Sequence, residues 1–260
     1  MDTDRLAYKG LRCLGRSGGL GERGAHAVEL RAARLDLRLD AAARLFERYN
    51  LVSVPVVDES ERLVGVLRLE GVCLLTNVDD VYIGHPDFEP LYAELDRLKV
   101  ATFIHPCYPP GKEARDYDIP RMLIDYPFET TKVATNLIFN GVTSRYPDIP
   151  FILSHAGGTL PMLAHRLSIF DKLTKFRDNY PEGALAHIAR FYYDTALSGH
   201  AAPLTALRAF VPDTQILFGT DYPYRTPAET AQGLANCGFS AAELREIDCD
   251  NALRLLSART

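Results

Sequence analysis

Histidine and aspartate side chains follow three short apolar runs of the chain. His105 ends "ATFIH", His155 ends "FILSH", and Asp221 follows "ILFGT". Imidazole and carboxylate groups together are the ligands that zinc and similar divalent metals take in proteins. A metal held by His105 and Asp221 would polarise a bound water or a substrate oxygen. His155 would then be a second ligand or an acid/base, provided that the fold brings the three groups together.

Other polar residues carry weaker signals. Asp194 ends "FYYD", and it either orients a neighbour or caps a helix. Three tyrosines on predicted loops either wall a pocket or occupy exposed turns: Tyr108, Tyr222 and Tyr224. The remaining histidines have no partner in the pattern, and two of them lie inside predicted helices: His26, His85, His165, His187 and His200.

Apolar runs alternate with helical patterns from residue 71 onward. The pattern predicts strands at 71–76, 100–105, 150–155, 191–196 and 215–219. It predicts helices at 87–98, 128–146, 160–176, 183–190, 201–210, 227–236 and 240–256. Strands that alternate with helices in this way indicate βαβ units and a parallel sheet.

Two architectures with a parallel sheet are compatible with this pattern: an open doubly wound sheet and a closed (β/α)₈ barrel. The open sheet is disfavoured because the chain has no GxGxxG motif, and no convincing strand precedes its glycine-rich stretch at 15–24. In a barrel, the carboxyl ends of all strands open into one mouth, where polar groups at strand ends converge. We therefore predict an α/β fold of the (β/α)₈ TIM-barrel type, incomplete because only about five βα units are recognisable.

The first 70 residues show a different pattern. "SVPVV" (53–57) and "LVGVL" (63–67) flank a short acidic turn, which predicts a β-hairpin, and a helical pattern precedes them. Residues 1–39 are rich in arginine and glycine and contain no clear strand. We expect three parts: an irregular segment at 1–39, a helix with a hairpin at 40–70, and the βα portion at 71–260.

Composition limits the classes of partner. The chain has 260 residues, a formal net charge of -5 and a pI of about 5.8, which argues against nucleic acid and anionic membranes. No apolar run approaches the roughly 20 residues that span a bilayer, and the N-terminus lacks the apolar core of a signal peptide. The five cysteines include no CxxC pair. Free thiols in a reducing, cytoplasmic compartment are expected.

Several stretches resemble the amidohydrolase superfamily: "FIHP" (103–106), "GVTSRYPDIPFILSHAGGTLPMLAHRL" (141–167), "YYDTALS" (192–198) and "ILFGTDYPY" (216–224). Within it they resemble the branch of aminocarboxymuconate-semialdehyde decarboxylase and the resorcylate and methylsalicylate decarboxylases, over roughly residues 70–256. The resemblance implies a (β/α)₈ barrel with one divalent metal, zinc first and manganese as the alternative. It implies His105 and Asp221 as metal ligands, and His155 beside Asp221 as catalytic residues.

The implied reaction is metal-dependent nonoxidative decarboxylation of a small aromatic or dienoic carboxylic acid. One alternative is a metal-dependent hydrolase of an ester, lactone or amide. In that superfamily the first barrel strand ends in an HxH pair of ligands, and this chain contains no HxH, which would impair turnover.

Residues 40–72, "DAAARLFERYNLVSVPVVDESERLVGVLRLEGV", instead resemble part of a CBS domain. This resemblance adds a second alternative, a non-catalytic nucleotide-sensing or scaffold protein. We also expect a homo-oligomer, because five uncovered βα units need a partner.

Overall fold

The computed structural model describes residues 53–57, 63–68, 71–111 and 119–257. Contacts divide the chain between Leu69 and Glu70 into two units, and each is described by itself. In the first unit, β1 (Ser53–Val57) and β2 (Leu63–Arg68) pair antiparallel. This pairing confirms the predicted hairpin. The predicted helix before it and the irregular segment at 1–39 lie outside the described residues.

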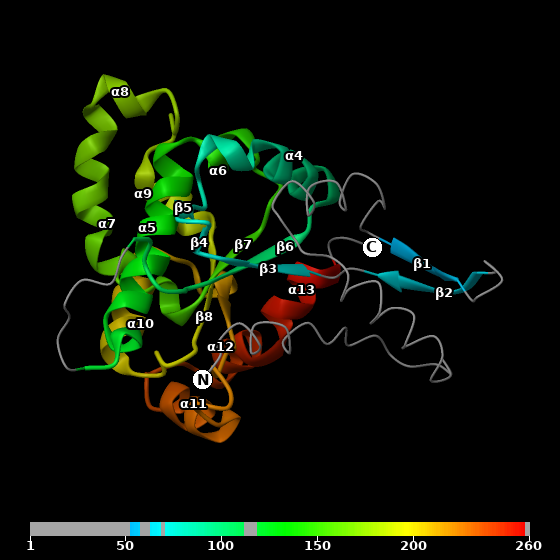
Figure 1. The fold of residues 1–260 in the computed structure, drawn as a ribbon. Helices are drawn as coiled ribbons and strands as arrows, with labels where there is room; N and C mark the ends of the chain where they lie inside the picture. Colours follow the sequence, from blue (N-terminus) through cyan, green and yellow to red (C-terminus); the bar gives the residue numbers. More distant parts are fainter. Residues whose placement is uncertain (1–52, 58–62, 69–70, 112–118, 258–260) are drawn as a thin grey trace. The chain divides into compact units, whose positions relative to one another are not determined.

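A parallel sheet forms the centre of the second unit (Figure 1). Its five strands follow the chain in the order β3 (Gly71–Leu75), β6 (Ala101–His105), β7 (Phe151–Leu153), β8 (Tyr192–Asp194) and β9 (Ile216–Leu217). Neighbouring strands all pair parallel. The predicted parallel α/β arrangement is confirmed. Within the described residues β3 and β9 are the two edges of the sheet, so this part of the chain does not close a barrel.

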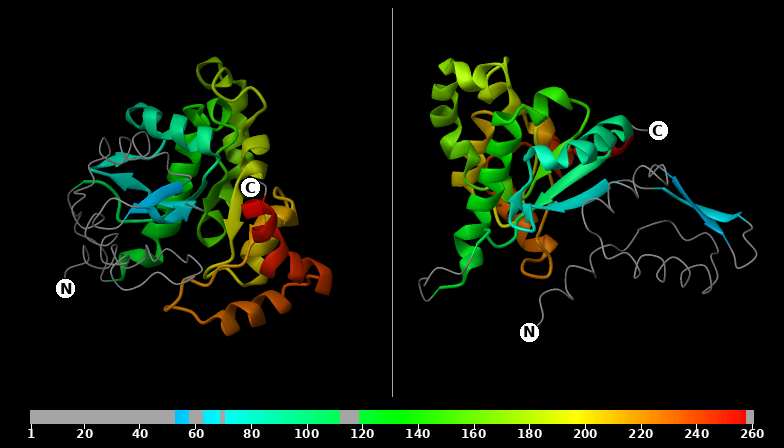
Figure 2. Two further views of the ribbon diagram at one scale, coloured as in Figure 1. Left: turned by 90° about the vertical axis from the view of Figure 1, so that its right-hand side faces the viewer. Right: turned by 45° about the horizontal axis from the view of Figure 1, so that its top comes forward.

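Helices fill the connections between these strands. After β3 comes a small hairpin, β4 (Asn77–Val78) with β5 (Val81–Tyr82). The α-helices are α4 (Glu89–Leu98), α5 (Asp125–Phe139), α6 (Val142–Arg145), α7 (Leu160–Ser168), α8 (Thr174–Arg177), α9 (Ala184–Arg190), α10 (Ala201–Arg208), α11 (Pro227–Ala235), α12 (Ala241–Arg245) and α13 (Asn251–Ser257). The C-terminal helices α11 to α13, orange to red, group apart from α4 to α9 in Figure 1 and in the left view of Figure 2.

Some predicted helices are divided in the structure. The predicted helix at 128–146 becomes α5 and α6, because Gly141 between them adopts a φ of 71° that interrupts the helix. The predicted helix at 160–176 becomes α7, a 3₁₀ turn (Ile169–Lys172) and α8. The predicted helix at 240–256 contains a π turn (Glu246–Asp250) between α12 and α13.

The core lies between the sheet and its helices. On α5, four positions on consecutive turns are completely buried: Val133, Ala134, Leu137 and Ile138. Their spacing places them on one stripe of the helix, as expected for a helix that covers a sheet. The strands contribute Ile104, Leu153, Tyr193 and Ile216, all of them fully buried as well. This packing fixes the strand ends that carry the polar groups.

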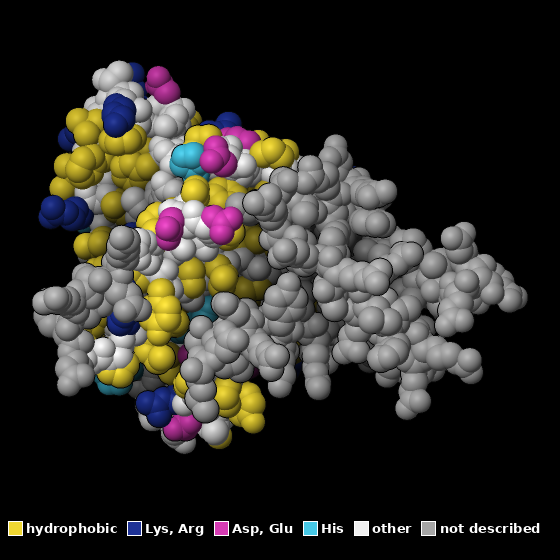
Figure 3. Space-filling model, viewed as in Figure 1, with side chains coloured by type: hydrophobic (Ala, Val, Ile, Leu, Met, Phe, Trp, Pro, Cys, Tyr) yellow, Lys and Arg dark blue, Asp and Glu magenta, His cyan; other side chains and the backbone are white. Residues whose placement is uncertain are grey.

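Apolar side chains also remain on the outer surface of α7 and the segment after it. Met162 is 75% exposed, Ile169 60% and Leu173 46%. Figure 3 shows hydrophobic side chains gathered at this end of the molecule. Among the described residues, no helix is both long enough and apolar enough to pass through a bilayer.

Candidate metal centre

The three strand-end groups lie together. His105 is the last residue of β6, His155 follows β7, and Asp221 follows β9. One ligand atom from each lies within 4.8 Å of the others. The His155 Nε2 and Asp221 Oδ2 atoms are 3.8 Å apart, and the rings of His105 and His155 are 5.9 Å apart. Because the carboxyl ends of parallel strands meet at one edge, groups distant in sequence converge there.

The backbone is strained where it directs two of these side chains. His155 has a φ of 56° and Asp221 a φ of 59°, in the left-handed region that non-glycine residues rarely adopt. Such residues cost about 1–3 kcal/mol each and cluster at functional sites. Gly158 keeps the next turn close to α5, since a Cβ there would lie 2.0 Å from the carbonyl oxygen of Pro127. The small residues after His155 therefore let this loop approach the neighbouring helix.

Asp194 holds the loop of His155 from the next strand. Its Oδ1 accepts the backbone N–H of His155 at 2.7 Å and that of Ala196 at 3.1 Å. The carboxylate is buried, and burial raises the pKa of Asp194 to about 7. Gly219 permits the close approach of the next strand end, because a Cβ there would lie 2.8 Å from the Asp194 Cβ. Of the two roles expected for Asp194, the structure shows the orientation of a neighbour.

Electrostatics favour neutral imidazoles at the site. Burial lowers the pKa of His105, and the nearby Asp221 carboxylate only partly opposes it. Burial also lowers the pKa of His155, with the opposite effect of Asp221 and a further lowering by His105. A neutral imidazole is the form that binds metal. The buried Nδ1 of His155 has no hydrogen-bond partner among the described residues. The neutral His105 imidazole and the Asp221 carboxylate are donors that suit a divalent metal, and the adjacent His155 ring, with its unpartnered Nδ1, is placed to be either a further ligand or an acid/base.

The other histidines considered in the sequence do not join this site. His85 and His200 each accept a backbone N–H at the start of a helix, from Asp87 at 3.2 Å and from Ala202 at 3.4 Å. His165 is exposed on α7. His187 is buried against the ring of Tyr180. His26 lies outside the described residues.

The sequence patterns did not single out two residues that lie beside the site. The ring of Tyr126, at the start of α5, stands edge-on to His105 with 6.4 Å between centroids. Cys107 follows His105 by two residues, and its Sγ accepts the Asn77 Nδ2 at 3.2 Å. Nothing local marks either residue, because each is defined by a contact with another part of the chain. Among the expected loop tyrosines, Tyr108 reaches Tyr126 at 5.6 Å between ring centroids.

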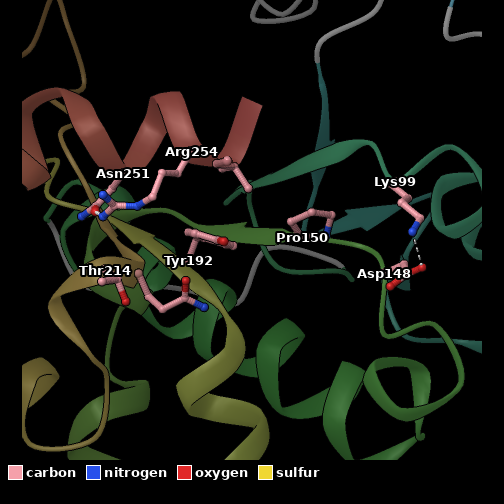
Figure 4. Close-up of a pocket in the computed structure, with 9 residues that line it drawn as sticks. Lys99, Asp148, Pro150, Tyr192, Thr214, Asn251 and Arg254 are labelled. Carbon is pink, nitrogen blue, oxygen red and sulfur yellow. Dashed lines mark hydrogen bonds and ion pairs between the residues drawn. The ribbon is translucent and has the colours of Figure 1, made fainter. Parts of the chain in front are cut away.

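A separate cavity of about 430 Å³ lies at the opposite end of the sheet (Figure 4). Lys99 and Pro150 precede β6 and β7, and Tyr192 begins β8, so the cavity is at the amino ends of the strands. Lys99 and Asp148 form an ion pair of 3.0 Å at its rim (Figure 4). In barrel folds this end serves stability, whereas chemistry occurs at the carboxyl ends. The cavity is therefore not part of the candidate metal centre.

Comparison with known families supports the family resemblance. Residues 19–257 match the family model described as amidohydrolase. The chain belongs to the amidohydrolase family. The match begins well before residue 40 and runs through 40–70, and the interpretation of that segment as part of a CBS domain gains no support from any comparison.

Relatives of this amidohydrolase include decarboxylases, as the sequence resemblance predicted. The chain is 36% identical over 208 residues to a 6-methylsalicylic acid decarboxylase of Penicillium expansum, which covers 77% of this chain and 64% of that relative. It is 28% identical over 173 residues to a 2-amino-3-carboxymuconate-6-semialdehyde decarboxylase of Dictyostelium discoideum, covering 65% of this chain and 47% of that relative. The chain thus spans about half to two thirds of the length of these relatives.

A solved structure shares the fold. It is a dihydroxybenzoic acid decarboxylase from Polaromonas sp. JS666 with bound manganese and an inhibitor. The TM-score is 0.64 at 21% sequence identity, over 91% of this chain and 74% of the other. The likeness confirms the α/β fold class, while closure into an eight-stranded barrel stays a prediction.

Proposed function

We propose that this amidohydrolase is a metal-dependent nonoxidative decarboxylase of a small aromatic or dienoic carboxylic acid. The observation that carries the proposal is the convergence of His105, His155 and Asp221 at the carboxyl edge of the sheet. The fold alone would not support it, because barrels host many chemistries. The decarboxylase names of the relatives favour this reaction over others that the same donor set could perform.

His105 and Asp221 are the proposed metal ligands. Imidazole and carboxylate donors suit both zinc and manganese. Zinc is our first choice, and the manganese in the solved relative supports the alternative. When bound, the metal would act as a Lewis acid that polarises a substrate oxygen. The chain has no HxH pair, so the two further histidine ligands expected from the family resemblance are absent from its sequence.

His155 is the proposed acid/base. Burial lowers the pKa of His155, so its protonated form is a stronger acid than an ordinary imidazolium. We infer that it delivers a proton to the substrate carbon that bears the carboxylate. The bond between that carbon and the carboxylate then breaks, its electron pair stays on the carbon skeleton, and carbon dioxide leaves. The net change is the replacement of a carboxylate by hydrogen, with one proton consumed.

Asp194 is a positioning residue in this mechanism. Its Oδ1 accepts the backbone N–H of His155 at 2.7 Å. Among the described residues, the structure shows no hydrogen bond between Asp194 and the proposed ligands His105 and Asp221. The bond keeps the strained loop of His155 against β8. Loss of the bond would therefore let the imidazole move relative to His105 and Asp221.

Hydrolysis of an ester, lactone or amide is the second candidate. The same three groups could serve a metal-bound water as nucleophile. It ranks lower because the relatives reported above are named as decarboxylases. The non-catalytic alternative depended on the CBS resemblance, which has no support.

The test is carbon dioxide release by the full chain loaded with zinc or with manganese. Substrates would include 6-methylsalicylate and a dienoic acid, with product identified by mass spectrometry. His155→Asn should lower the rate at least about 100-fold, the usual contribution of a general acid, while metal content stays the same. His165→Asn is the matched control, because His165 is exposed on α7 and should leave the rate unchanged. A folded, metal-loaded chain that releases no carbon dioxide from any of these acids would refute the proposal.

A further inference from the structure

Side chains hold the chain directly after His105, because the pairing of β3 with β6 ends there. His105 is the last residue of β6 and pairs with Leu75 of β3. The next residue, Pro106, has no backbone N–H to donate. The first N–H after His105 is therefore that of Cys107, which donates to the Oγ1 of Thr76 at 3.1 Å. The Thr76 side chain thus continues the contact between the two strands beyond their backbone pairing.

The peptide unit between Pro106 and Cys107 links Thr76 to the imidazole of His105. Burial lowers the pKa of His105, and two smaller effects oppose it: the Asp221 carboxylate and a hydrogen bond to the backbone of Pro106. Because proline has no N–H, the partner is its carbonyl oxygen, and a ring nitrogen of His105 is the donor. This carbonyl and the N–H that Thr76 accepts belong to one planar unit. A group that fixes the N–H therefore also fixes the carbonyl.

The orientation of the His105 ring matters for metal binding. When one nitrogen of a neutral imidazole donates a hydrogen bond, the other carries the lone pair that a metal takes. His105 is one of the three groups whose ligand atoms lie within 4.8 Å of one another. Loss of a partner that orients a metal-binding histidine typically lowers metal affinity by about 10- to 100-fold.

Two neighbouring side chains hold this loop. Thr76 is fully buried, and its Oγ1 also lies 3.2 Å from the Sγ of Cys107. Asn77 is partly buried. Its Nδ2 donates to the carbonyl oxygen of Tyr108 at 2.8 Å and to the Sγ of Cys107 at 3.2 Å. The two residues after Pro106 are thus both held from the segment that follows β3.

This segment is itself anchored. The N–H of Ile83 donates to the carbonyl oxygen of Thr76 at 3.0 Å. Tyr82, which lies opposite Asn77 in the β4–β5 hairpin, donates its hydroxyl to the Oε1 of Glu129 at 3.0 Å. Glu129 is buried in α5. The side chains that hold the loop therefore come from an element fixed to a helix, as precise placement of a metal ligand requires.

We propose that Thr76 is a positioning residue of the candidate metal centre. Its hydroxyl fixes the peptide unit at 106–107, and through it the orientation and tautomer of the His105 ring. Asn77 supports the same loop and has the smaller effect. In this role Thr76 does not contact the metal. The inference rests on the metal centre of the proposed function and adds two residues to it.

The first test is the zinc affinity of the full chain, measured by competition with a chelator. Thr76→Val removes the hydroxyl, keeps the shape of the side chain and should weaken zinc binding about 10-fold. Thr76→Ser keeps the hydroxyl and should restore most of the affinity. Asn77→Ala should weaken zinc binding about threefold, the effect of one ordinary hydrogen bond.

Thr102→Val is the matched control. Thr102 lies in the same strand as His105, near its amino end, and is fully buried. Its hydroxyl donates to the carbonyl oxygen of Val100 at 3.1 Å. Thr102→Val therefore removes a comparable buried hydroxyl without touching the loop after His105. Its zinc affinity should equal that of the wild type, even where its free energy of unfolding is lower.

The second test follows the tautomer of His105 in the metal-free protein by ¹⁵N NMR of the imidazole nitrogens, assigned with His105→Gln. The wild type and Thr76→Ser should show one protonated and one unprotonated ring nitrogen at His105. Thr76→Val should show a mixture of the two tautomers. A purely structural role of Thr76 would lower stability and leave these signals unchanged.

Three results would overturn the inference. They are equal zinc affinity of Thr76→Val and wild type, an equal loss of affinity in Thr102→Val, and an unchanged His105 tautomer in Thr76→Val. If Thr76→Val does not fold, Asn77→Ala decides, and unchanged zinc affinity there refutes the inference.

The two tests also separate this inference from the proposed function. A wild type that binds no zinc refutes the metal centre, while a changed tautomer in Thr76→Val still shows that Thr76 orients His105. Carbon dioxide release by a wild type whose zinc affinity does not depend on Thr76 refutes the positioning role alone.

Discussion

Replacement of Asp194 by asparagine should make the protein more stable at neutral pH, although it removes a buried group beside the candidate site. The asparagine side-chain oxygen can accept the same two N–H groups, from His155 and Ala196, that the carboxylate accepts at 2.7 and 3.1 Å. The two side chains differ in charge, because the carboxyl group can ionise and the amide cannot. Burial, together with the Asp221 carboxylate, raises the pKa of Asp194 from 3.8 to about 7. The folded protein therefore resists ionisation of this carboxyl group.

The sign follows from proton binding. Between pH 4 and pH 7, roughly, the unfolded chain has lost this proton while the folded chain still holds it, so wild-type stability falls as pH rises through that window. A displacement of three pKa units corresponds to about 4 kcal/mol once both states are ionised. The amide in the variant cannot ionise, so the variant does not lose this stability as pH rises. The stability of Asp194→Asn relative to wild type should therefore grow by about 3 kcal/mol between pH 5 and pH 8.

The assay is urea unfolding of both metal-free proteins at several values between pH 5 and pH 8. Asp178→Asn, an exposed position after α8, serves as the surface control and should show no comparable trend. If the stability difference between Asp194→Asn and wild type were the same at pH 5 and pH 8, the assigned burial of this carboxylate would be wrong. A uniform loss of stability in the variant would instead show that the amide cannot replace the carboxylate at the two N–H groups.

Three further substitutions test the packing that positions the site. Gly158→Ala should lower the free energy of unfolding by at least about 2 kcal/mol in chemical denaturation, because its Cβ would meet a carbonyl oxygen at 2.0 Å. Gly238 also has a positive φ, but a Cβ there would meet nothing within 4 Å, so Gly238→Ala should cost less. Leu137→Ala, in the buried stripe of α5, should lower the free energy of unfolding by about 2–5 kcal/mol, and Met162→Ala, at a side chain that is 75% exposed, by less than about 0.5 kcal/mol. Thr226→Ala should cost about 1 kcal/mol by removing the capping box of α11, with Thr226→Ser as a control that keeps it. If a substitution and its control lost the same amount of stability, the contact that this pair tests would be contradicted.

The candidate site was predictable because its residues carry local signals. His105, His155 and Asp221 each follow an apolar run, and the carboxyl ends of parallel strands meet at one edge. The end of the strand before His155 was less predictable. β7 stops at Leu153, and the φ of 56° at His155 turns the chain, whereas the predicted strand continued to residue 155. Backbone strain of this kind has no signature in residue type.

Features that depend on contacts between elements could not be predicted. Tyr126 looks like any aromatic residue at the start of a helix, and only its ring contact with the last residue of β6 brings it to the site. The short helix-and-hairpin pattern at 40–70 predicted the β1–β2 pairing correctly, because strand alternation is local. The same pattern suggested a CBS domain, but one helix and one hairpin occur in many folds and do not identify a family. The three-part division of the chain and a homo-oligomer stay predictions.

Metal content tests the central claim most directly. The full chain would be purified as a single species, loaded with zinc or manganese, freed of excess metal and measured by elemental mass spectrometry beside His105→Ala, Asp221→Ala and the control His165→Ala. We expect about one metal ion per chain in the wild type and in the control, and little in the two ligand variants, since a catalytic site of this type holds one ion through few protein ligands. No bound metal in a folded wild-type chain, or equal metal in all four proteins, would contradict the assignment of this site.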